Sequence, residues 1–373
     1  MRQAYSAGQE IFILESRSTE AASWVIRISE VFSEFTNEII HGLGAKPAKK
    51  LGSEYFLIHV NDPRTVQESD AAKFIRWNLP IQHCWPCNPE QMDGFVEKAA
   101  QAIFRKFGKL HFQAIFIGQL DPGVSNRYYK SLASNLRGRT LQLFPEEIAK
   151  FKEIEAQNSD VPTLFCLVGK EGLFCGVQNP KASNGLYPGG TKYISQSAPD
   201  TISRAGAKIA EALHYLLMHR TVPAKGSHWL ELGASPGGMT SELLGREYKV
   251  TAIDRASLDK RLDHHPDLRF FLSDVATFEP KGRTIFEAIL SDMNGDAQDA
   301  MRHVIRLSKH LADGGLVIFT LKTSGVATFS EINESYVTVV QSAAAAGLHL
   351  LARTHLTYNR LEFTLFFEKA GLV

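Results

Sequence analysis

Residues 228–240 read HWLELGASPGGMT, in which an apolar run passes directly into a glycine-rich loop. Gly233 permits a tight turn, and Gly237 and Gly238 let backbone amides approach a ligand at the start of the helix expected next. A second apolar run ends at Asp254, 21 residues after Gly233. A carboxylate at that place is suited to bind the hydroxyls of a ribose. The stretch therefore predicts a nucleotide-binding strand–loop–helix unit.

Strand-like and helix-like stretches alternate regularly around this loop. Strands are expected at residues 228–233, 248–253, 268–273, 287–291, 315–321, 348–354 and 361–367. Such alternation implies a parallel sheet with helices on its faces, and seven strands in about 150 residues fit one doubly wound domain. We predict an α/β fold whose C-terminal Rossmann-like domain covers residues 196–373.

The loop spacing bears on the kind of nucleotide. A dinucleotide fingerprint is G-x-G-x-x-G, whereas this loop is G-x-x-x-G-G with Pro236 inside it, which disfavours a dehydrogenase. The loop resembles the first motif of S-adenosylmethionine-dependent methyltransferases. In those enzymes the residues after the third strand contact adenine, a place held here by Asp274 and Val275. An Asp after a strand is also a common helix cap, so both roles stay open for Asp274.

That resemblance implies S-adenosylmethionine as the cofactor. The residues it implies for cofactor binding are Glu231, Gly233, Ala234, Ser235, Pro236, Gly237, Gly238, Met239, Asp254, Asp274, Val275 and Asp292.

Four charged residues lie at the ends of expected elements. Lys208 precedes the first strand, Asp292 and Lys322 follow the fourth and fifth strands, and Glu362 begins the last strand. Ligands of doubly wound sheets bind beyond the carboxyl ends of the strands. In the methyltransferase variant of this sheet the last strand is antiparallel, so Glu362 faces the same edge. Each residue alone could belong to an ordinary surface ion pair. Together they predict a site with two ammonium groups and two carboxylates.

Lys-Asp-Lys-Glu in this order resembles the tetrad of ribose 2'-O-methyltransferases of the FtsJ-like superfamily, over about residues 200–373. The chain is most similar to RlmM-like enzymes, which methylate a ribose of large-subunit ribosomal RNA and carry a THUMP RNA-binding domain ahead of the catalytic one. The stretch from Cys175 through Asn179 to Ser203 is similar to their domain junction. Two departures are Met239, where that family has Trp, and Glu231, where Asp is commoner.

The resemblance implies catalytic roles for the four residues. Lys322 is the candidate base that takes the proton of the ribose hydroxyl, because burial and a nearby ammonium make a lysine easier to deprotonate. Asp292 would orient Lys322, and Glu362 would hold Lys208 and the ribose. The alternative is that Lys322 stays charged and only steers the hydroxyl, with late proton loss. The reaction needs no metal.

The N-terminal half is expected to hold two smaller α+β domains, at residues 1–80 and 81–195, the second of them THUMP-like. We expect a strand at 10–14, an amphipathic helical stretch over 21–40 and a loop over 42–50. The segment 179–200, dense in Gly, Pro, Ser and Asn, is the expected boundary before the catalytic domain. Basic residues interleaved with tyrosines suit RNA, and these are Arg127, Lys130, Arg137 and Arg139.

Composition limits the class of protein. The 373 residues hold 41 Lys and Arg against 40 Asp and Glu, and 4 Cys. These values exclude a polycation and a disulfide framework. With no apolar run long enough for a membrane span, we expect a cytoplasmic protein that acts on RNA, and the resemblance implies ribosomal RNA. Cys84 and Cys87 have the spacing of half a zinc site, but apolar packing is the simpler interpretation. The alternatives are an RNA-binding protein with an inactive methyltransferase fold and a methyltransferase for small molecules or proteins.

Overall fold

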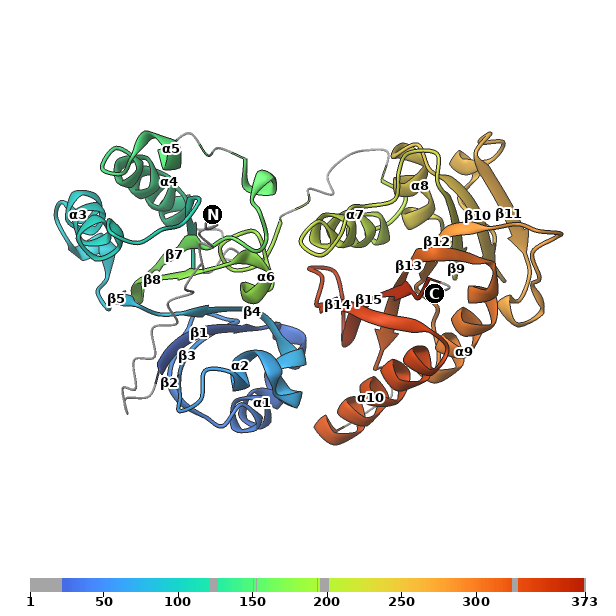
Figure 1. Cartoon of the computed structure of the whole chain (residues 1–373), viewed down its shortest axis with the longest axis horizontal. Coiled ribbons are helices and arrows are strands. Elements are labelled where there is room, and N and C mark those ends of the chain that lie inside the picture. Colours follow the sequence, from blue (N-terminus) through green and yellow to red (C-terminus); the bar gives the residue numbers. More distant parts are fainter. Residues whose placement is uncertain are drawn as a thin grey trace, which may run out of the picture.

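The computed structural model of the chain describes residues 22–120, 127–149, 151, 153–192, 194, 201–323 and 328–371. Within these ranges the strands form three sheets, two of them in the half of the molecule that Figure 1 shows in blue to green. None of the described helices combines the length and apolarity that crossing a bilayer requires.

The first sheet has the strand order β2-β3-β1-β4. Its strands are β1 (Ala22–Ile28), β2 (Ala45–Leu51), β3 (Tyr55–Val60) and β4 (Ile75–Pro80). It is accompanied by α1 (Thr36–Gly42), α2 (Thr65–Glu68) and the 3-10 turns η1 (Glu30–Phe35) and η2 (Asp70–Phe74).

Two sequence predictions for this part are wrong. Residues 22–28 form a strand and not the start of a helix, because they lie inside the sheet with apolar neighbours on both faces, which removes the strand's usual alternation. Residues 45–51 form strand β2 and not a loop. Their lysines and Pro47 fit the edge position, where charged side chains and proline discourage further pairing. The strand expected at 10–14 lies outside the described residues.

The second sheet has the order β5-β8-β7-β6. Its strands are β5 (His83–Trp85), β6 (Ile115–Gln119), β7 (Thr163–Gly169) and β8 (Gly172–Gln178). Its helices are α3 (Phe95–Phe107), α4 (Arg127–Leu141), α5 (Glu146–Ala149) and the short α6 (Pro180–Ser183).

The third sheet has seven described strands in the order β11-β10-β9-β12-β13-β15-β14. They are β9 (His228–Leu232), β10 (Lys249–Asp254), β11 (Leu268–Leu272), β12 (Phe286–Ser291), β13 (Leu311–Lys322), β14 (Leu348–Thr354) and β15 (Glu362–Lys369). β15 pairs antiparallel with both of its neighbours, whereas the pairs from β11 to β13 are parallel. The predicted seven strands and the antiparallel last strand are confirmed.

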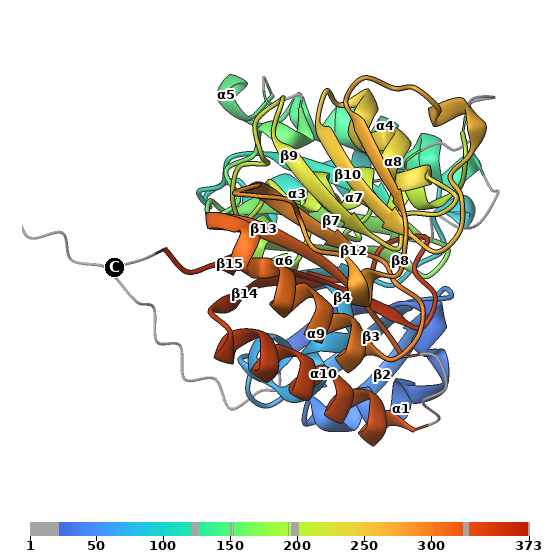
Figure 2. The same cartoon turned by 90° about the vertical axis from the view of Figure 1, so that its right-hand side faces the viewer.

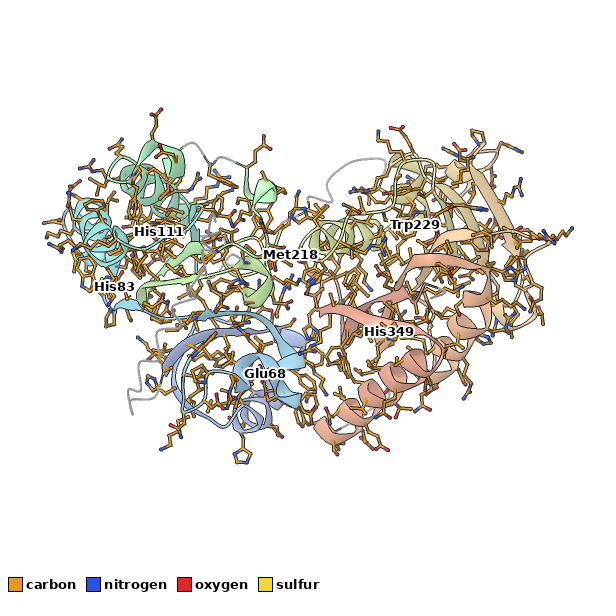
Figure 3. The ribbon with its side chains drawn as sticks, in the orientation of Figure 1. Glu68, His83, His111, Met218, Trp229 and His349 are labelled. Atoms are coloured by element: carbon orange, nitrogen blue, oxygen red, sulfur yellow. The ribbon has the colours of Figure 1, made fainter. Side chains whose placement is uncertain are left out.

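Helices cover both faces of this sheet. α9 (Ala297–Leu307) and α10 (Phe329–Ala345) pack on one face, as Figure 2 shows, and α7 (Ala205–Leu216) and α8 (Gly238–Gly245) on the other. Trp229 of β9 is fully buried within these layers (Figure 3). The apolar runs predicted from the sequence thus form one core on each side of the sheet.

The three sheets share cores. Phe363 of β15 packs against Phe32 and Phe74 of the first unit, with ring centroids 5.3 and 5.4 Å apart. The other face of the first sheet packs on the second sheet, where the Trp77 and Phe165 rings lie 6.0 Å apart. An isolated 196–373 fragment would therefore expose Phe363 and its apolar neighbours, so experiments call for the full chain.

The expected boundary at 179–200 is not a free linker over its described first part. Arg27 of β1 donates to the carbonyl oxygen of Gly189 at 2.7 Å. A Cβ on Gly189 would lie 2.2 Å from the Tyr55 hydroxyl, and one on Gly190 would lie 2.8 Å from the Cβ of Trp77. The glycines in this segment serve close packing on the first sheet.

Candidate functional site

The predicted site residues lie at one edge of the third sheet. Ser291 of β12 pairs with Leu232 of β9, so Asp292 and Gly233 both follow at the carboxyl edge. In the antiparallel pair of β13 and β15, Lys322 is the direct partner of Glu362. The strand order therefore delivers residues from four places in the chain to one edge.

The four charged side chains are in contact. Lys208 Nζ, from the first turn of α7, lies 2.8 Å from Glu362 Oε2 and 3.8 Å from Asp292 Oδ2. Lys322 Nζ lies 3.3 Å from Asp292 Oδ1. All four side chains are only 10–16% exposed. The convergence expected from the sequence is present as geometry, while the catalytic roles remain a prediction.

Lys322 has further acceptors that the sequence did not indicate. Its Nζ donates to the carbonyl oxygen of Asp292 at 3.1 Å and to Asn294 Oδ1 at 2.7 Å. Asn294 escaped prediction because an Asn in a turn usually serves the turn itself. Its contact, together with the Asp292 carboxylate, surrounds the Lys322 ammonium with acceptors.

A cavity of about 560 Å³ lies beside this cluster. Among the predicted cofactor residues, those that line it are Gly233, Asp254, Asp274 and Val275. Further lining residues that sequence reasoning missed include Arg255, Met293, Asn294, Arg302 and His303. The remaining predicted residues of the glycine loop, together with Glu231 and Asp292, do not line the cavity.

Asp254 is fixed at the mouth of the glycine loop. Its Oδ2 accepts the Ser235 N–H at 2.9 Å, and its Oδ1 accepts the Ala256 N–H at 2.8 Å. Gly233 has φ +80°, and a Cβ there would lie 3.0 Å from the Cα of Met293. A carboxylate that is held in place beside a closely packed glycine turn suits the hydroxyls of an adenosine ribose. The cavity therefore fits the predicted cofactor.

We expect Asp254→Ala to weaken S-adenosylmethionine binding about 10- to 150-fold, because a hydrogen bond to a charged group contributes about 1.5–3 kcal/mol. Isothermal titration of the full chain measures this. Asp263→Ala, which removes an exposed carboxylate away from the cavity, is the control. An Asp254 variant that binds as tightly as wild type, or a wild-type chain that prefers NAD, would refute the assignment.

Asp274 takes the capping role that the sequence left open. Its Oδ1 accepts the Ala276 N–H at 2.8 Å at the start of the 3-10 turn η6 (Val275–Thr277). Its Oδ2 also lies 2.9 Å from Arg255 Nη2. Because the residue caps the turn and lines the cavity at once, capping does not remove it from the predicted adenine end.

Glu231 lies beneath the glycine loop and is 2% exposed. Its Oε2 accepts the Thr240 hydroxyl at 2.7 Å, which ties β9 to α8. Burial, with the nearby charges of Asp292 and Asp254, raises the pKa of this carboxyl to about 8. In the structure its contact is with the protein framework and not with the cavity.

The predicted RNA-binding run divides into two pairs. Arg137 is engaged internally, since Nε donates to the Ile115 carbonyl at 2.9 Å and Nη2 to the Phe151 carbonyl at 3.1 Å. These bonds tie α4 to β6 and to the chain after α5, and the RNA contact of Arg137 stays a prediction. Arg139 forms an ion pair with Glu97 of α3 at 2.5 Å. Arg127 and Lys130 are exposed on the first turn of α4.

The described residues contain no group of three or more His, Cys, Asp or Glu side chains placed to hold a metal ion. Cys84 and Cys87 are free thiols in the second unit, and burial raises the pKa of both.

Comparison with known proteins shows which family the C-terminal domain resembles. Residues 201–354 match the model of the FtsJ-like methyltransferase family. The ribosomal RNA large subunit methyltransferase M of Halorhodospira halophila is 39% identical over 79 residues, 21% of this chain and 23% of that protein. The protein of the same name from Shewanella loihica is 25% identical over 221 residues, 57% of this chain and 59% of that protein. The chain thus matches less than two thirds of these relatives' own length.

Among solved structures, the fibrillarin pre-rRNA processing protein of Methanococcus jannaschii is 15% identical, with a TM-score of 0.36 over 60% of this chain and 86% of that one. TrmN from Thermus thermophilus is 14% identical, with a TM-score of 0.37 over 93% and 99%. These TM-scores are below 0.5, so the assignment depends on the sequence matches. On those matches, residues 201–354 are similar to the FtsJ-like methyltransferases, and S-adenosylmethionine is the methyl donor that this similarity supports.

Proposed function

We propose that this protein methylates the 2' oxygen of a ribose in RNA, with large-subunit ribosomal RNA as the substrate. The observation that carries the proposal is the contact of Lys208, Asp292, Lys322 and Glu362 beside the cavity assigned to the cofactor. The relatives named for ribosomal RNA methylation support the substrate class. A methyltransferase for small molecules would not need two lysines held by two carboxylates at this edge.

When bound, S-adenosylmethionine supplies an electrophilic methyl group. The residues of the chain must then align the ribose hydroxyl with that methyl and allow its proton to leave as the C–O bond forms. The Asp292 carboxylate lies between the two ammonium groups and holds both near the sheet edge. Glu362 fixes Lys208 from the other side. The four residues thus form a preorganised polar surface for one hydroxyl.

The contacts of Lys322 bear on its two alternative roles. Its Nζ donates to two oxygen acceptors and faces the Asp292 carboxylate. These contacts hold the amino group at the sheet edge, where both roles require it. The two roles separate experimentally, since a neutral base requires the rate to rise with pH until the lysine is deprotonated.

The test is methyl transfer in vitro from isotopically labelled S-adenosylmethionine to ribosomal RNA, followed by digestion to nucleosides and mass spectrometry. The proposal expects the label on ribose. Label on a base would contradict ribose methylation, and cofactor binding without transfer to any RNA would support the alternative of an inactive methyltransferase fold.

We further propose that the N-terminal half binds the RNA substrate through α4, as the predicted THUMP-like domain would. Replacing Arg127 and Lys130 by Ala should flatten the log–log dependence of affinity on salt by up to about 1.4 units, at roughly 0.7 per phosphate contact on single strands. Filter binding across a salt series measures the slope. Arg139→Ala is the control, since this side chain already pairs with Glu97. An unchanged slope in the double variant would locate the RNA surface elsewhere.

A further inference from the structure

The elements that carry two of the four site residues face the first two sheets. Figure 1 shows α7, which carries Lys208, and the adjoining β14 and β15 on the side of the third sheet nearest to β4 and α6. We call this interface of α7, β14 and β15 with β4 and α6 the seam. Met218, just after α7, is buried there (Figure 3). The seam therefore lies between the predicted RNA-binding half and the candidate active site.

A buried ion pair crosses the seam. Arg76 of β4 donates through Nη2 to Glu211 Oε1 of α7 at 2.8 Å, and the two side chains are 3% and 8% exposed. The same Nη2 donates to the Thr357 hydroxyl at 3.0 Å. Glu211 Oε2 accepts the Thr357 N–H at 2.8 Å. Arg76, Glu211 and Thr357, which we call the seam triad, thus join three separate elements in one network.

Each partner of Arg76 is close in sequence to a site residue. Glu211 lies three residues after Lys208 on α7, hence on the next turn of the same helix. Thr357 lies in the turn between β14 and β15, five residues before Glu362. Because Lys208 and Glu362 bond to each other at 2.8 Å, the triad fixes the two elements whose spacing sets that contact.

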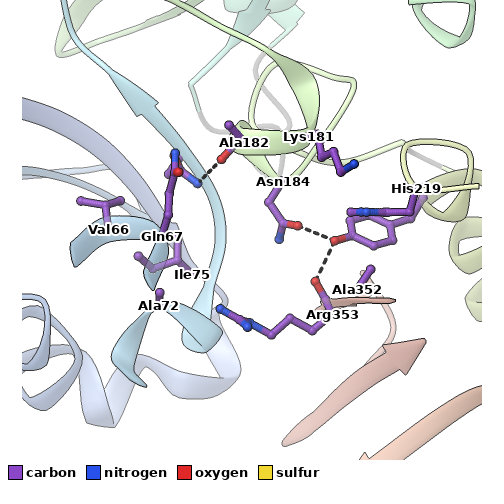
Figure 4. A pocket seen from close by; sticks show the side chains of 12 residues that line it. Val66, Gln67, Ala72, Ile75, Lys181, Ala182, Asn184, His219, Ala352 and Arg353 are labelled. Atoms are coloured by element: carbon purple, nitrogen blue, oxygen red, sulfur yellow. Dashed lines mark hydrogen bonds between the residues drawn. The ribbon is translucent and has the colours of Figure 1, made fainter. Parts of the chain in front are cut away.

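A second set of bonds supports the same seam. The Asn184 side-chain amide donates to the Arg76 carbonyl at 3.0 Å. The Tyr215 hydroxyl of α7 lies within hydrogen-bonding distance of Asn184 Oδ1 and of the Arg353 carbonyl, and Figure 4 marks both contacts by dashed lines at Asn184 and Arg353. The His355 ring lies between the carbonyl oxygens of Lys73 and Glu362, at 3.0 and 3.2 Å. The cavity of about 220 Å³ beside these bonds has lining residues from all three units.

We propose that Arg76 is a positioning residue for methyl transfer, which acts through Glu211 and Thr357 to set the geometry of Lys208 and Glu362. This inference rests on the proposed function. It gives the first sheet a part in assembling the active site in addition to any contact with RNA. A displacement of about 1 Å at a reacting group can reduce the rate about 100-fold, so a small shift of α7 would be visible in kcat.

The variants must keep the protein folded. Removing Arg76 alone leaves the Glu211 carboxylate buried without a counter-ion, whereas replacing both members of a buried ion pair by apolar residues of similar volume is often tolerated. The test variant is therefore Arg76→Met with Glu211→Met. A milder variant, Thr357→Val, removes the hydroxyl and keeps the backbone N–H that bonds to Glu211.

The matched control is Arg27→Met with Glu54→Met. This pair is also a buried ion pair of the first sheet, at 2.5 Å, with side chains 7% and 16% exposed. Arg27 also donates to Gly189 and Thr191, neither of which is on an element that carries a site residue. A merely structural contribution of buried ion pairs would affect test and control variants alike.

The measurement is steady-state methyl transfer by the full-length protein. We expect kcat to fall about 10- to 100-fold in the Arg76/Glu211 variant and about 3- to 10-fold in Thr357→Val, with KM for cofactor and RNA within about threefold of wild type. The control should keep the wild-type kcat. When Lys208→Met is already present, the Arg76/Glu211 change should lower kcat little further, because both act on the same contact.

Three results with an active wild-type protein would overturn the positioning role. The Arg76/Glu211 variant could keep the wild-type kcat, it could change KM and not kcat, or its loss of kcat could add in full to the loss caused by Lys208→Met. A wild-type protein that transfers no methyl group would instead contradict the proposed function, and the proposal on Arg76 with it.

Discussion

Lys322→Ala should lose methyl transfer by about 10²- to 10⁴-fold while it keeps its affinity for S-adenosylmethionine. Lys322 ends β13, and its Nζ contacts Asp292 and Asn294. The loop and the carboxylate assigned to the cofactor belong to other strands, since Gly233 follows β9 and Asp254 ends β10. The loss is expected whether Lys322 acts as a base or as a charged guide, because either role needs an amino group at this place.

Single-turnover transfer gives the rate and titration gives the affinity. The control is Lys309→Ala, because Lys309 lies in the 3-10 turn η7 (Ser308–His310) before β13, at the opposite end of the strand, and its ammonium pairs with Glu279. A Lys322 variant within about tenfold of the wild-type rate would remove this residue from the reaction.

Glu231→Gln should make the protein more stable than wild type at pH 8 and about equally stable near pH 4.5. The pKa of Glu231 is raised from 4.5 to about 8 by burial, with the charges of Asp292 and Asp254 adding to the effect. A raised carboxyl pKa means that the folded state holds a proton that the unfolded state has already lost. Its stabilising effect is complete below pH 4.5 and is lost as the pH rises through about 8.

Above pH 8, the free energy of unfolding of Glu231→Gln should exceed that of wild type by at most about 5 kcal/mol, since one pKa unit corresponds to about 1.4 kcal/mol. Gln keeps an oxygen acceptor for the Thr240 hydroxyl, so the packing below the loop is retained. Urea unfolding midpoints of both proteins between pH 4.5 and 8.5 measure the effect. Glu242→Gln, on the surface of α8 beside Arg246, is the control. Parallel curves for wild type and Glu231→Gln would contradict the raised pKa.

The sequence predicted the C-terminal fold well because its parallel strands are buried on both faces and read as continuous apolar runs, separated by clear loop signals. The first sheet was harder to predict. Strand β1 has no alternation because it is covered on both sides, and β2 carries the lysines and proline of a protected edge.

For the candidate site, the sequence could predict which residues gather at the sheet edge but not all of their side-chain contacts. Lys208, Asp292, Lys322 and Glu362 could be found because each stands at a fixed place of a recognisable fold. Asn294, which bonds to Lys322, stands in a turn that no spacing rule singles out. Other partners depend on tertiary packing, as with Arg137, whose guanidinium turns inward to two carbonyl oxygens and lies over the Phe116 ring at 5.1 Å. The sequence shows that such a residue is basic, but it does not show in which direction the side chain points.

The most direct test of the central claim is a map of ribose methylation across the ribosomal RNA of cells that lack this protein. The map is compared with those of cells resupplied with wild type, Lys322→Ala or Lys309→Ala. We expect a ribose methylation that is absent without the protein, returns with wild type and Lys309→Ala, and stays absent with Lys322→Ala at equal protein level. A map that is the same with and without the protein, or a site restored by Lys322→Ala, would contradict the account.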